Sequence, residues 1–241
     1  MQTKCRCAVI KAVLFDCDGT LVDSEYTHYL SWQYALQQLG GDLSLEEYYS
    51  YVGKSSAVIA EQMAEKLTRC SADAILMEKR GYYQALHSSG LPLIVPTVEF
   101  LLSLLQEKER LDLKIGVCSA AKKTEVSSHV ERLGIGDRLD VVLSGQEDLV
   151  GYSDPEGVNK PKPYIYQHAM KLLNVSPHEC VVIEDSASGV RAGVDAGCFT
   201  IAVPNEYTLR HDLSHAHLRV DSFAGISIDQ FFQMVSLKNR D

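Results

Sequence analysis

The sequence predicts an α/β protein that has a doubly wound parallel sheet and an all-helical segment inserted after the first strand. Two observations lead to this fold class. From residue 97 onward, short apolar runs typical of buried strands alternate with amphipathic helical stretches, which is the pattern of strands joined by helical crossovers. Between residues 24 and 89 the pattern is almost wholly helical and contains no convincing strand.

The first predicted strand, residues 12–15, is apolar and leads directly into Asp16 and Asp18. Because side chains alternate along an extended strand, these two carboxylates can face one pocket. Gly19 follows at once and lets the backbone leave the strand at angles that other residues resist. Ligands bind at the carboxyl ends of the strands in open α/β sheets, so we expect a functional site here.

The helical insert is predicted from apolar residues at helical spacing. The predicted helices cover residues 24–39, 55–67 and 72–87. The first of them ends at Gly40 and Gly41, which stop a helix. Ser44 and Glu47 have the spacing of a capping box, which begins a further short helix.

The rest of the chain supplies the sheet and its crossovers. The further strands are predicted at residues 114–118, 141–143, 180–183, 199–203 and 218–220. The further helices are predicted at residues 97–109, 122–133, 164–173, 188–196 and 229–237. Residues 144–160 form a long loop, and loops of this length in compact domains are often functional. We expect an α/β core of residues 1–21 and 93–241 and a helical domain of residues 22–92.

Charge and composition exclude several classes of partner. The 241 residues include 23 Lys and Arg against 32 Asp and Glu, which gives a net charge of −9. An acidic surface attracts neither nucleic acid nor an anionic membrane, so we expect neither as the main partner. The longest apolar runs are far shorter than the ~20 residues that span a bilayer, and the N-terminus shows no signal segment. We expect a cytoplasmic protein that is a monomer or a small homo-oligomer.

The 7 cysteines are odd in number and scattered, which does not indicate a disulfide framework. Several of them lie within predicted strands, where a thiol acts as a small buried apolar group. Cys5 and Cys7 could bind a metal or form a pair, but no second pair of closely spaced cysteines completes a zinc site.

Ser119 ends the second predicted strand of the core, and Ala120 and Ala121 open the next helix. A hydroxyl combined with free backbone N–H groups at a helix N-terminus is an arrangement that binds phosphate. A serine that only caps the helix would leave the same pattern, and one serine can do both.

The segment Asn159-Lys160-Pro161-Lys162-Pro163 follows the third strand and the long loop. The prolines fix the backbone and can aim a lysine, which would neutralise a phosphoryl group and a nearby carboxylate. Taken alone, the segment also suits an ordinary surface loop. Lys160 and Lys162 are both candidates for this role.

Glu184 and Asp185 directly follow the strand predicted at residues 180–183. Two adjacent acids in this place are candidate ligands for a hard cation, because Mg²⁺ prefers carboxylate and water oxygens. The alternative is an aspartate that caps the following helix. With a cation present, one carboxylate of the Asp16 and Asp18 pair can act as nucleophile and the other as general acid and base.

Taken together, these segments resemble the haloacid dehalogenase superfamily of hydrolases, in the subfamily that has a helical cap after the first strand. Residues 16–25 look like the first motif of this family. Ser119 matches its second motif, Lys160 its third, and residues 184–190 look like its fourth. The resemblance covers nearly the whole chain and implies a Rossmann-like core with residues 22–92 as the cap. The chain departs from the usual pattern around the lysine, where the family has Gly and Asp in place of Asn159 and Tyr164.

The resemblance implies a Mg²⁺-dependent phosphatase that acts on a small phosphorylated metabolite, such as a sugar phosphate or phosphoglycolate. Asp16 would attack the phosphorus and form an aspartyl-phosphate. Asp18 would protonate the leaving oxygen and then activate water. Mg²⁺ would be held by Asp16, the backbone carbonyl of Asp18 and Asp185, with Glu184 in or near the coordination shell.

The phosphoryl group would be held by Ser119, by the backbone of Ala120 and by Lys160, according to the same resemblance. A true dehalogenase attacks carbon and needs no acid in the position of Asp18, so its presence favours phosphate chemistry.

The cap is expected to select the substrate. Residues 52–56 resemble the cap loop that reaches into the active site, so Gly53, Lys54 and Ser55 are candidates for contacting a second phosphate or a sugar hydroxyl. An exposed helix start is an equally simple interpretation of these residues.

His28, Trp32 and Lys79 occupy positions that resemble those β-phosphoglucomutase uses in its cap, so they are candidates for substrate binding. A mutase of that type is therefore the alternative function. Ser56 stands where that mutase has an arginine, which favours the phosphatase. A second alternative is a catalytically silent protein that binds a phosphorylated metabolite, and the complete set of acidic, hydroxyl and lysine side chains argues against it.

Overall fold

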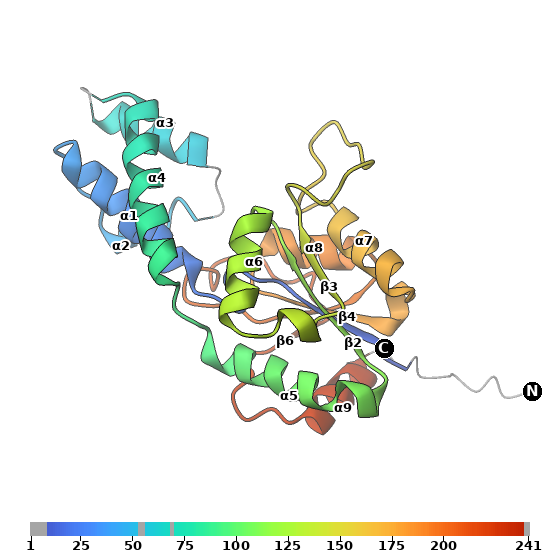
Figure 1. Ribbon diagram of the computed structural model, residues 1–241. Helices are drawn as coiled ribbons and strands as arrows, with labels where there is room; N and C mark the ends of the chain where they lie inside the picture. Colours follow the sequence, from blue (N-terminus) through green and yellow to red (C-terminus); the bar gives the residue numbers. More distant parts are fainter. Residues whose placement is uncertain (1–8, 53–55, 68–69, 239–241) are drawn as a thin grey trace, which may run out of the picture. The chain divides into compact units, whose positions relative to one another are not determined.

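The structure, a computed structural model, describes residues 9–52, 56–67 and 70–238 (Figure 1). Its contacts divide the chain into two compact units. Met1–Val22 and Leu93–Asp241 form the larger unit, and Asp23–Pro92 form the smaller one.

The part of the larger unit that the structure describes contains a six-stranded parallel sheet in the order β3-β2-β1-β4-β5-β6. The strands are β1 (Ala12–Phe15), β2 (Lys114–Ser119), β3 (Val141–Ser144), β4 (Cys180–Glu184), β5 (Phe199–Ala202) and β6 (Leu218–Arg219). Every residue of β1 and β4 is buried, as expected for central strands that are covered on both faces. The doubly wound α/β class predicted from the sequence is confirmed.

Helices cover both faces of the sheet (Figure 1). One face carries α5 (Val95–Leu111), α6 (Lys123–Arg132) and α9 (Ile228–Lys238), and the other carries α7 (Tyr164–Leu173) and α8 (Ala187–Asp195). Side chains of β1, β2, β3 and β4 pack against α7 and α8 in one continuous apolar cluster. On the opposite face, the ring of Phe100 in α5 stacks on Phe223 and contacts Phe231 of α9.

Strand β1 lies where the path of the chain across the sheet reverses. From β1 the chain steps outward to β2 and β3, and it then returns to β4, which pairs with the free side of β1. Phe15 lies beside Ile183 in this pairing, so Asp16 and Glu184 leave the sheet at adjacent points. Open α/β sheets bind ligands in the crevice at such a reversal, outside the carboxyl ends of the strands.

The chain leaves and re-enters the larger unit at one place. Val22 and Leu93 form an isolated antiparallel bridge, and the N–H of Ile94 donates to the carbonyl of Leu21 at 2.9 Å. The two segments that connect the smaller unit to the larger one are therefore hydrogen-bonded to each other.

The smaller unit is helical in its described residues, as predicted. Its helices are α1 (Ser24–Gln38), α2 (Leu45–Tyr48), α3 (Ser56–Lys66) and α4 (Ala72–Ser89). The Ser44 hydroxyl accepts from the N–H of Glu47 at 3.1 Å and caps α2, as the spacing of these two residues predicts. Along the described chain, no helix combines the length and the apolar character needed to cross a membrane.

Gly116 in β2 is a position where the sheet has no room for a side chain. A Cβ there would lie 2.4 Å from Val141 Cγ1 and 2.9 Å from Leu14 Cδ2. We expect Gly116→Ala to lower the free energy of unfolding by about 1–3 kcal/mol, because one extra methyl group overpacks the core. The free energy is measured by urea unfolding. Gly136→Ala is the matched control, since a Cβ there meets only Val130 at 3.6 Å; equal losses in the two variants would contradict the packing argument.

Candidate active site

Lys160 forms buried ion pairs with two carboxylates at the carboxyl edge of the sheet. Its Nζ donates to Asp16 Oδ1 at 2.5 Å and to Glu184 Oε1 at 2.7 Å, and also to the carbonyl of Cys118 at 2.8 Å. The side chains of Lys160, Asp16 and Glu184 are 4%, 7% and 1% exposed. The lysine therefore joins the ends of β1, β2 and β4, because it contacts one group from each of them.

The charges in this cluster alter each other's proton affinity. Burial, followed by the neighbouring charge of Glu184, raises the pKa of Asp16 to about 8. Burial opposes the charge on Lys160, but the facing carboxylates of Asp16 and Glu184 outweigh it and raise the pKa of Lys160 above its ordinary value. Lys160 therefore remains a cation and neutralises part of the negative charge.

Three buried acids at this edge could hold a metal ion. Asp16, Glu184 and Asp185 each offer an oxygen within 4.8 Å of the oxygens of the other two. The three acids have one buried ammonium beside them, and it pairs with Asp16 and Glu184, so the cluster would carry excess negative charge with all three acids ionised. A hard divalent cation prefers such oxygen ligands and would balance that excess. The donor set therefore fits Mg²⁺.

Asp18 is held by Ser119 at the end of β2. The Ser119 hydroxyl donates to Asp18 Oδ2 at 2.9 Å and accepts from the N–H of Ala121 at 3.0 Å. The prediction that Ala120 and Ala121 open the next helix was wrong, because α6 begins at Lys123. The hydroxyl of Ser119 binds the N–H of Ala121 in a turn that precedes the helix.

Asn159 connects the segment after β2 to Lys160. Its Nδ2 donates to the carbonyl of Ala120 at 2.9 Å, and its Oδ1 accepts from the N–H of Lys160 at 2.9 Å. Gly145 makes room for this side chain, since a Cβ on Gly145 would lie 2.2 Å from Asn159 Oδ1. Asn159 thus orients both the turn after Ser119 and the backbone of Lys160.

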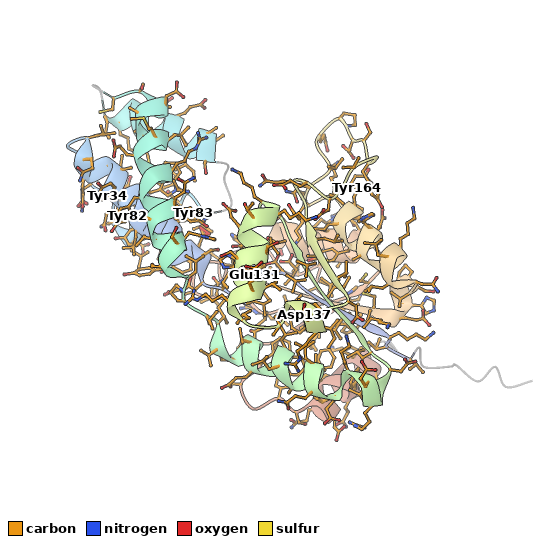
Figure 2. All side chains as sticks on the ribbon, in the orientation of Figure 1. Tyr34, Tyr82, Tyr83, Glu131, Asp137 and Tyr164 are labelled. Atoms are coloured by element: carbon orange, nitrogen blue, oxygen red, sulfur yellow. The ribbon has the colours of Figure 1, made fainter. Side chains whose placement is uncertain are left out.

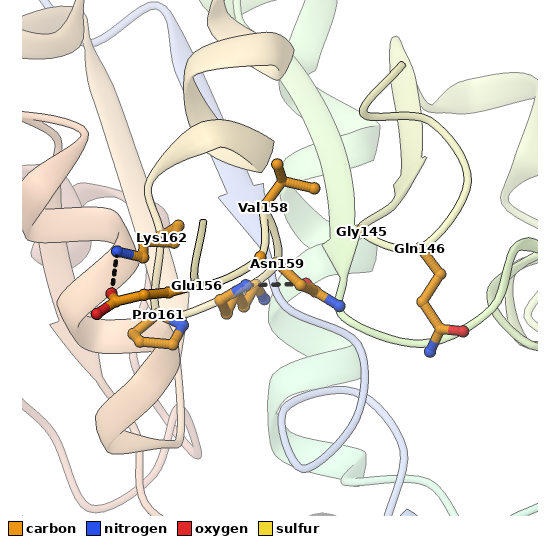
Figure 3. A pocket seen from close by; sticks show the side chains of 9 residues that line it. Gly145, Gln146, Glu156, Val158, Asn159, Pro161 and Lys162 are labelled. Atoms are coloured by element: carbon orange, nitrogen blue, oxygen red, sulfur yellow. Dashed lines mark hydrogen bonds and ion pairs between the residues drawn. The ribbon is translucent and has the colours of Figure 1, made fainter. Parts of the chain in front are cut away.

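The long loop after β3 holds Lys162 at a different place from Lys160. Lys162 Nζ lies 2.6 Å from Glu156 and 3.4 Å from Asp154, and the hydroxyl of Tyr164 donates to Asp154 at 3.1 Å. Residues 145–146 and 156–162 line a pocket of about 600 Å³, in which Lys162 turns toward Glu156 (Figure 3). This geometry favours Lys160 over Lys162 as the lysine of the acidic cluster.

Three cap candidates come together inside the smaller unit. Lys79 Nζ lies 2.9 Å from His28 Nδ1 and stands over the rings of Trp32 and Tyr83, at 5.4 and 4.5 Å from their centroids. His28 stacks on Tyr83 with a centroid separation of 4.4 Å. Burial, and then the charge of Lys79, lower the pKa of His28 to about 3. The imidazole is therefore neutral near pH 7. Figure 2 shows Tyr83 on α4.

Some sequence candidates lie outside the residues that the structure describes. They are Cys5, Cys7, Gly53, Lys54 and Ser55. The cysteines of the strands and their ends, Cys17, Cys118, Cys180 and Cys198, are free thiols and are buried, as the sequence predicts.

Two residues contact the acidic cluster although sequence reasoning did not single them out. The hydroxyl of Tyr166 donates to Glu184 Oε1 at 2.8 Å, and its ring centroid lies 5.0 Å from Lys160 Nζ. Asn205, which follows β5, donates to Asp185 Oδ2 at 2.9 Å. A polar residue just past the fifth strand is a signal that could have identified Asn205, whereas a tyrosine on the buried face of a helix gives none.

The sequence profile of the haloacid dehalogenase-like hydrolases matches residues 13–203. The chain belongs to this family. The resemblance seen in the motifs is therefore confirmed. Validoxylamine A 7′-phosphate phosphatase of Streptomyces hygroscopicus subsp. limoneus is 28% identical to this hydrolase over 204 residues, covering 84% of the present chain and 87% of that protein.

Two further relatives of the hydrolase have names that refer to sugar phosphates. The β-phosphoglucomutase of Bacillus subtilis is 28% identical over 201 residues, covering 80% of this chain and 83% of that protein. A CbbY mutant from Rhodobacter sphaeroides, solved in complex with xylulose 1,5-bisphosphate, has a TM-score of 0.68 at 26% identity. That match covers 91% of this chain and 97% of the CbbY chain.

The neutral state of His28 can be tested by NMR. Because its folded pKa lies below the usual value of about 6.5, His28 binds a proton more readily in the unfolded chain. Its contribution to stability is therefore complete above pH 6.5 and is lost as the pH falls toward 3. We expect the imidazole signals of His28 to show the neutral form at pH 5. Titration of His28 near pH 6.5 would contradict the assignment.

Proposed function

We propose that this hydrolase removes phosphate from a small phosphomonoester in a Mg²⁺-dependent reaction that passes through an aspartyl-phosphate on Asp16. The observation that carries the proposal is the buried contact of Asp16 with Lys160, beside two further acids at the same edge of the sheet. The names of two relatives, validoxylamine A 7′-phosphate phosphatase and β-phosphoglucomutase, support the same chemistry.

In the first step, a carboxylate oxygen of Asp16 attacks the phosphorus and forms the aspartyl-phosphate. The bond between phosphorus and the leaving oxygen breaks, and Asp18 gives its proton to that oxygen. Lys160, Ser119 and the N–H of Ala120 donate hydrogen bonds to the phosphoryl oxygens. Their positive charge and dipoles stabilise the negative charge of the transition state.

In the second step, water attacks the phosphorus and Asp18, now a carboxylate, accepts a proton from that water. The bond from phosphorus to Asp16 breaks, which releases inorganic phosphate and restores the free carboxylate. Asp16, the backbone carbonyl of Asp18 and Asp185 would hold Mg²⁺, with Glu184 beside them. The bound cation supplies positive charge that offsets the charge of the phosphoryl group.

A β-phosphoglucomutase-type reaction is the second candidate, and the cluster of His28, Trp32 and Lys79 favours it. In that reaction the phosphoryl group on Asp16 passes to a hydroxyl of a sugar monophosphate instead of to water. The resulting bisphosphate then turns around and returns its other phosphoryl group to Asp16. The two functions differ in the acceptor of the phosphoryl group and share the first step.

A panel of hexose phosphates, pentose phosphates, phosphoglycolate and nucleotides tests the phosphatase. We expect phosphate release from a narrow set of these compounds with Mg²⁺, and none with excess EDTA. Asp16→Asn keeps the size of the side chain but removes the nucleophile, so it should lower kcat by on the order of 10⁴-fold or more. Its circular dichroism spectrum should match that of the wild type.

The same panel separates the candidates. Conversion of β-glucose 1-phosphate to glucose 6-phosphate with little free phosphate would replace the phosphatase by the mutase. Mg²⁺-dependent turnover by Asp16→Asn would show that another group attacks the phosphorus.

Two lysine variants test which lysine serves the phosphoryl group. Lys160 contacts Asp16, whereas Lys162 is paired with the loop acids Glu156 and Asp154. We expect Lys160→Ala to lower kcat/KM by roughly 10²–10³-fold, the usual loss when one group that stabilises transition-state charge is removed. Lys162→Ala, the matched control, should stay within about threefold of the wild type. The reverse order of effects, measured by phosphate release from correctly folded variants, would assign the role to Lys162.

A further inference from the structure

We propose that Asn205 is a positioning residue that orients Asp185 for binding of the metal ion. The inference rests on the proposed function, because Asp185 is one of the residues expected to hold Mg²⁺. Asn205 lies in the segment Pro204-Asn205-Glu206-Tyr207-Thr208, immediately after β5, and belongs to none of the four sequence motifs.

The side-chain amide of Asn205 connects two segments of the acidic cluster. Its Nδ2 donates to Asp185 Oδ2 and to the carbonyl of Gly19, both at 2.9 Å. Gly19 belongs to the stretch that begins with Asp16 and Asp18, so one amide group links the segment after β1 to the segment after β4.

The orientation of this amide follows from its other neighbours. Asn205 Oδ1 accepts from the backbone N–H groups of Tyr207 at 2.9 Å and Thr208 at 3.2 Å. A backbone N–H can only donate, so the atom facing these two groups must be the oxygen. The nitrogen therefore faces Asp185, and the turn after β5 holds it there.

The backbone of Gly19 also confines the same oxygen of Asp185. Gly19 has φ +86°, and a Cβ built on it would lie 2.3 Å from Asp185 Oδ2 and 3.0 Å from Asn205 Nδ2. Asp185 Oδ2 is thus approached closely by a glycine that lacks a side chain and accepts a hydrogen bond from the amide of Asn205. Hydrogen bonds of this kind orient a metal ligand and raise the affinity of its site.

Mn²⁺ binding to the full-length protein, followed by electron paramagnetic resonance, tests the proposal without relying on turnover. We expect Asn205→Ala to weaken Mn²⁺ binding by about 10-fold, the lower end of the usual loss for a residue that supports a metal ligand. The Mg²⁺ concentration for half-maximal activity should rise by the same factor, while KM for substrate at saturating Mg²⁺ stays unchanged.

Thr208→Ala is the matched control. Its hydroxyl accepts from the N–H of Asn205 at 3.0 Å and lies 3.3 Å from Asn205 Oδ1. Its loss therefore disturbs the same turn but keeps the amide group and the two backbone N–H groups that orient it. A purely structural role predicts that both variants lower the urea midpoint and that neither changes Mn²⁺ affinity. Mn²⁺ affinity of a folded Asn205→Ala within twofold of the wild type would overturn the proposal.

A double variant shows whether Asn205 acts through Asp185. Adding Asn205→Ala to Asp185→Ala should cause no further loss of Mn²⁺ binding, because the group that is oriented is already absent. A further 10-fold loss would overturn the proposal.

If Asn205→Ala does not fold, Asn205→Asp takes its place, since it keeps the oxygen that accepts from the N–H groups of Tyr207 and Thr208. A Mn²⁺ affinity of this variant within twofold of the wild type would likewise overturn the proposal. A wild type that binds no Mn²⁺ would overturn the metal assignment in the proposed function, whereas an unaffected variant of a Mn²⁺-binding wild type overturns only this inference.

Discussion

The buried contact of Lys160 with Asp16 and Glu184 is the constraint on which the rest of this edge depends. An ammonium and two carboxylates taken out of water are costly unless each finds partners, and here every one of them does. The arrangement needs β1 and β4 side by side, the turn that carries Lys160 folded back over both, and Tyr166 behind Glu184. The geometry that lowers the cost of burying these charges also places the carboxylate of Asp16 and the ammonium of Lys160 together at the carboxyl edge of the sheet.

The fold was predictable because its signals are local. The apolar run of residues 12–15 and the alternation of strands and helices beyond residue 97 appear in the sequence without any knowledge of tertiary contacts. Asp16, Ser119 and Glu184 could also be placed at one edge, since each ends a strand of a parallel sheet and those ends must meet. Lys160 follows β3 at a distance and could be placed only by resemblance.

The finer features depended on contacts between distant segments. The bond from Ser119 to Asp18, and the late start of α6 at Lys123, are set by side chains that reach across turns. The contact of Asn205 with Asp185 joins segments that follow different strands. Periodicity and composition do not reveal such contacts, because the contacts depend on the three-dimensional position of a side chain and not on its neighbours in the sequence.

Because the helical unit is attached to the rest of the chain at a single place, sequence changes within it can occur separately from changes in the sheet. Val22 and Leu93 are bridged, so the two ends of the 70-residue segment Asp23–Pro92 are held together, as the two ends of a short hairpin loop are. Substitutions, insertions or even replacement within that segment leave the register of β1 with β2 and β4 untouched. A lineage can therefore alter the side chains of the helices while the acids and the lysine keep their positions, and relatives in this family carry names for different phosphorylated compounds.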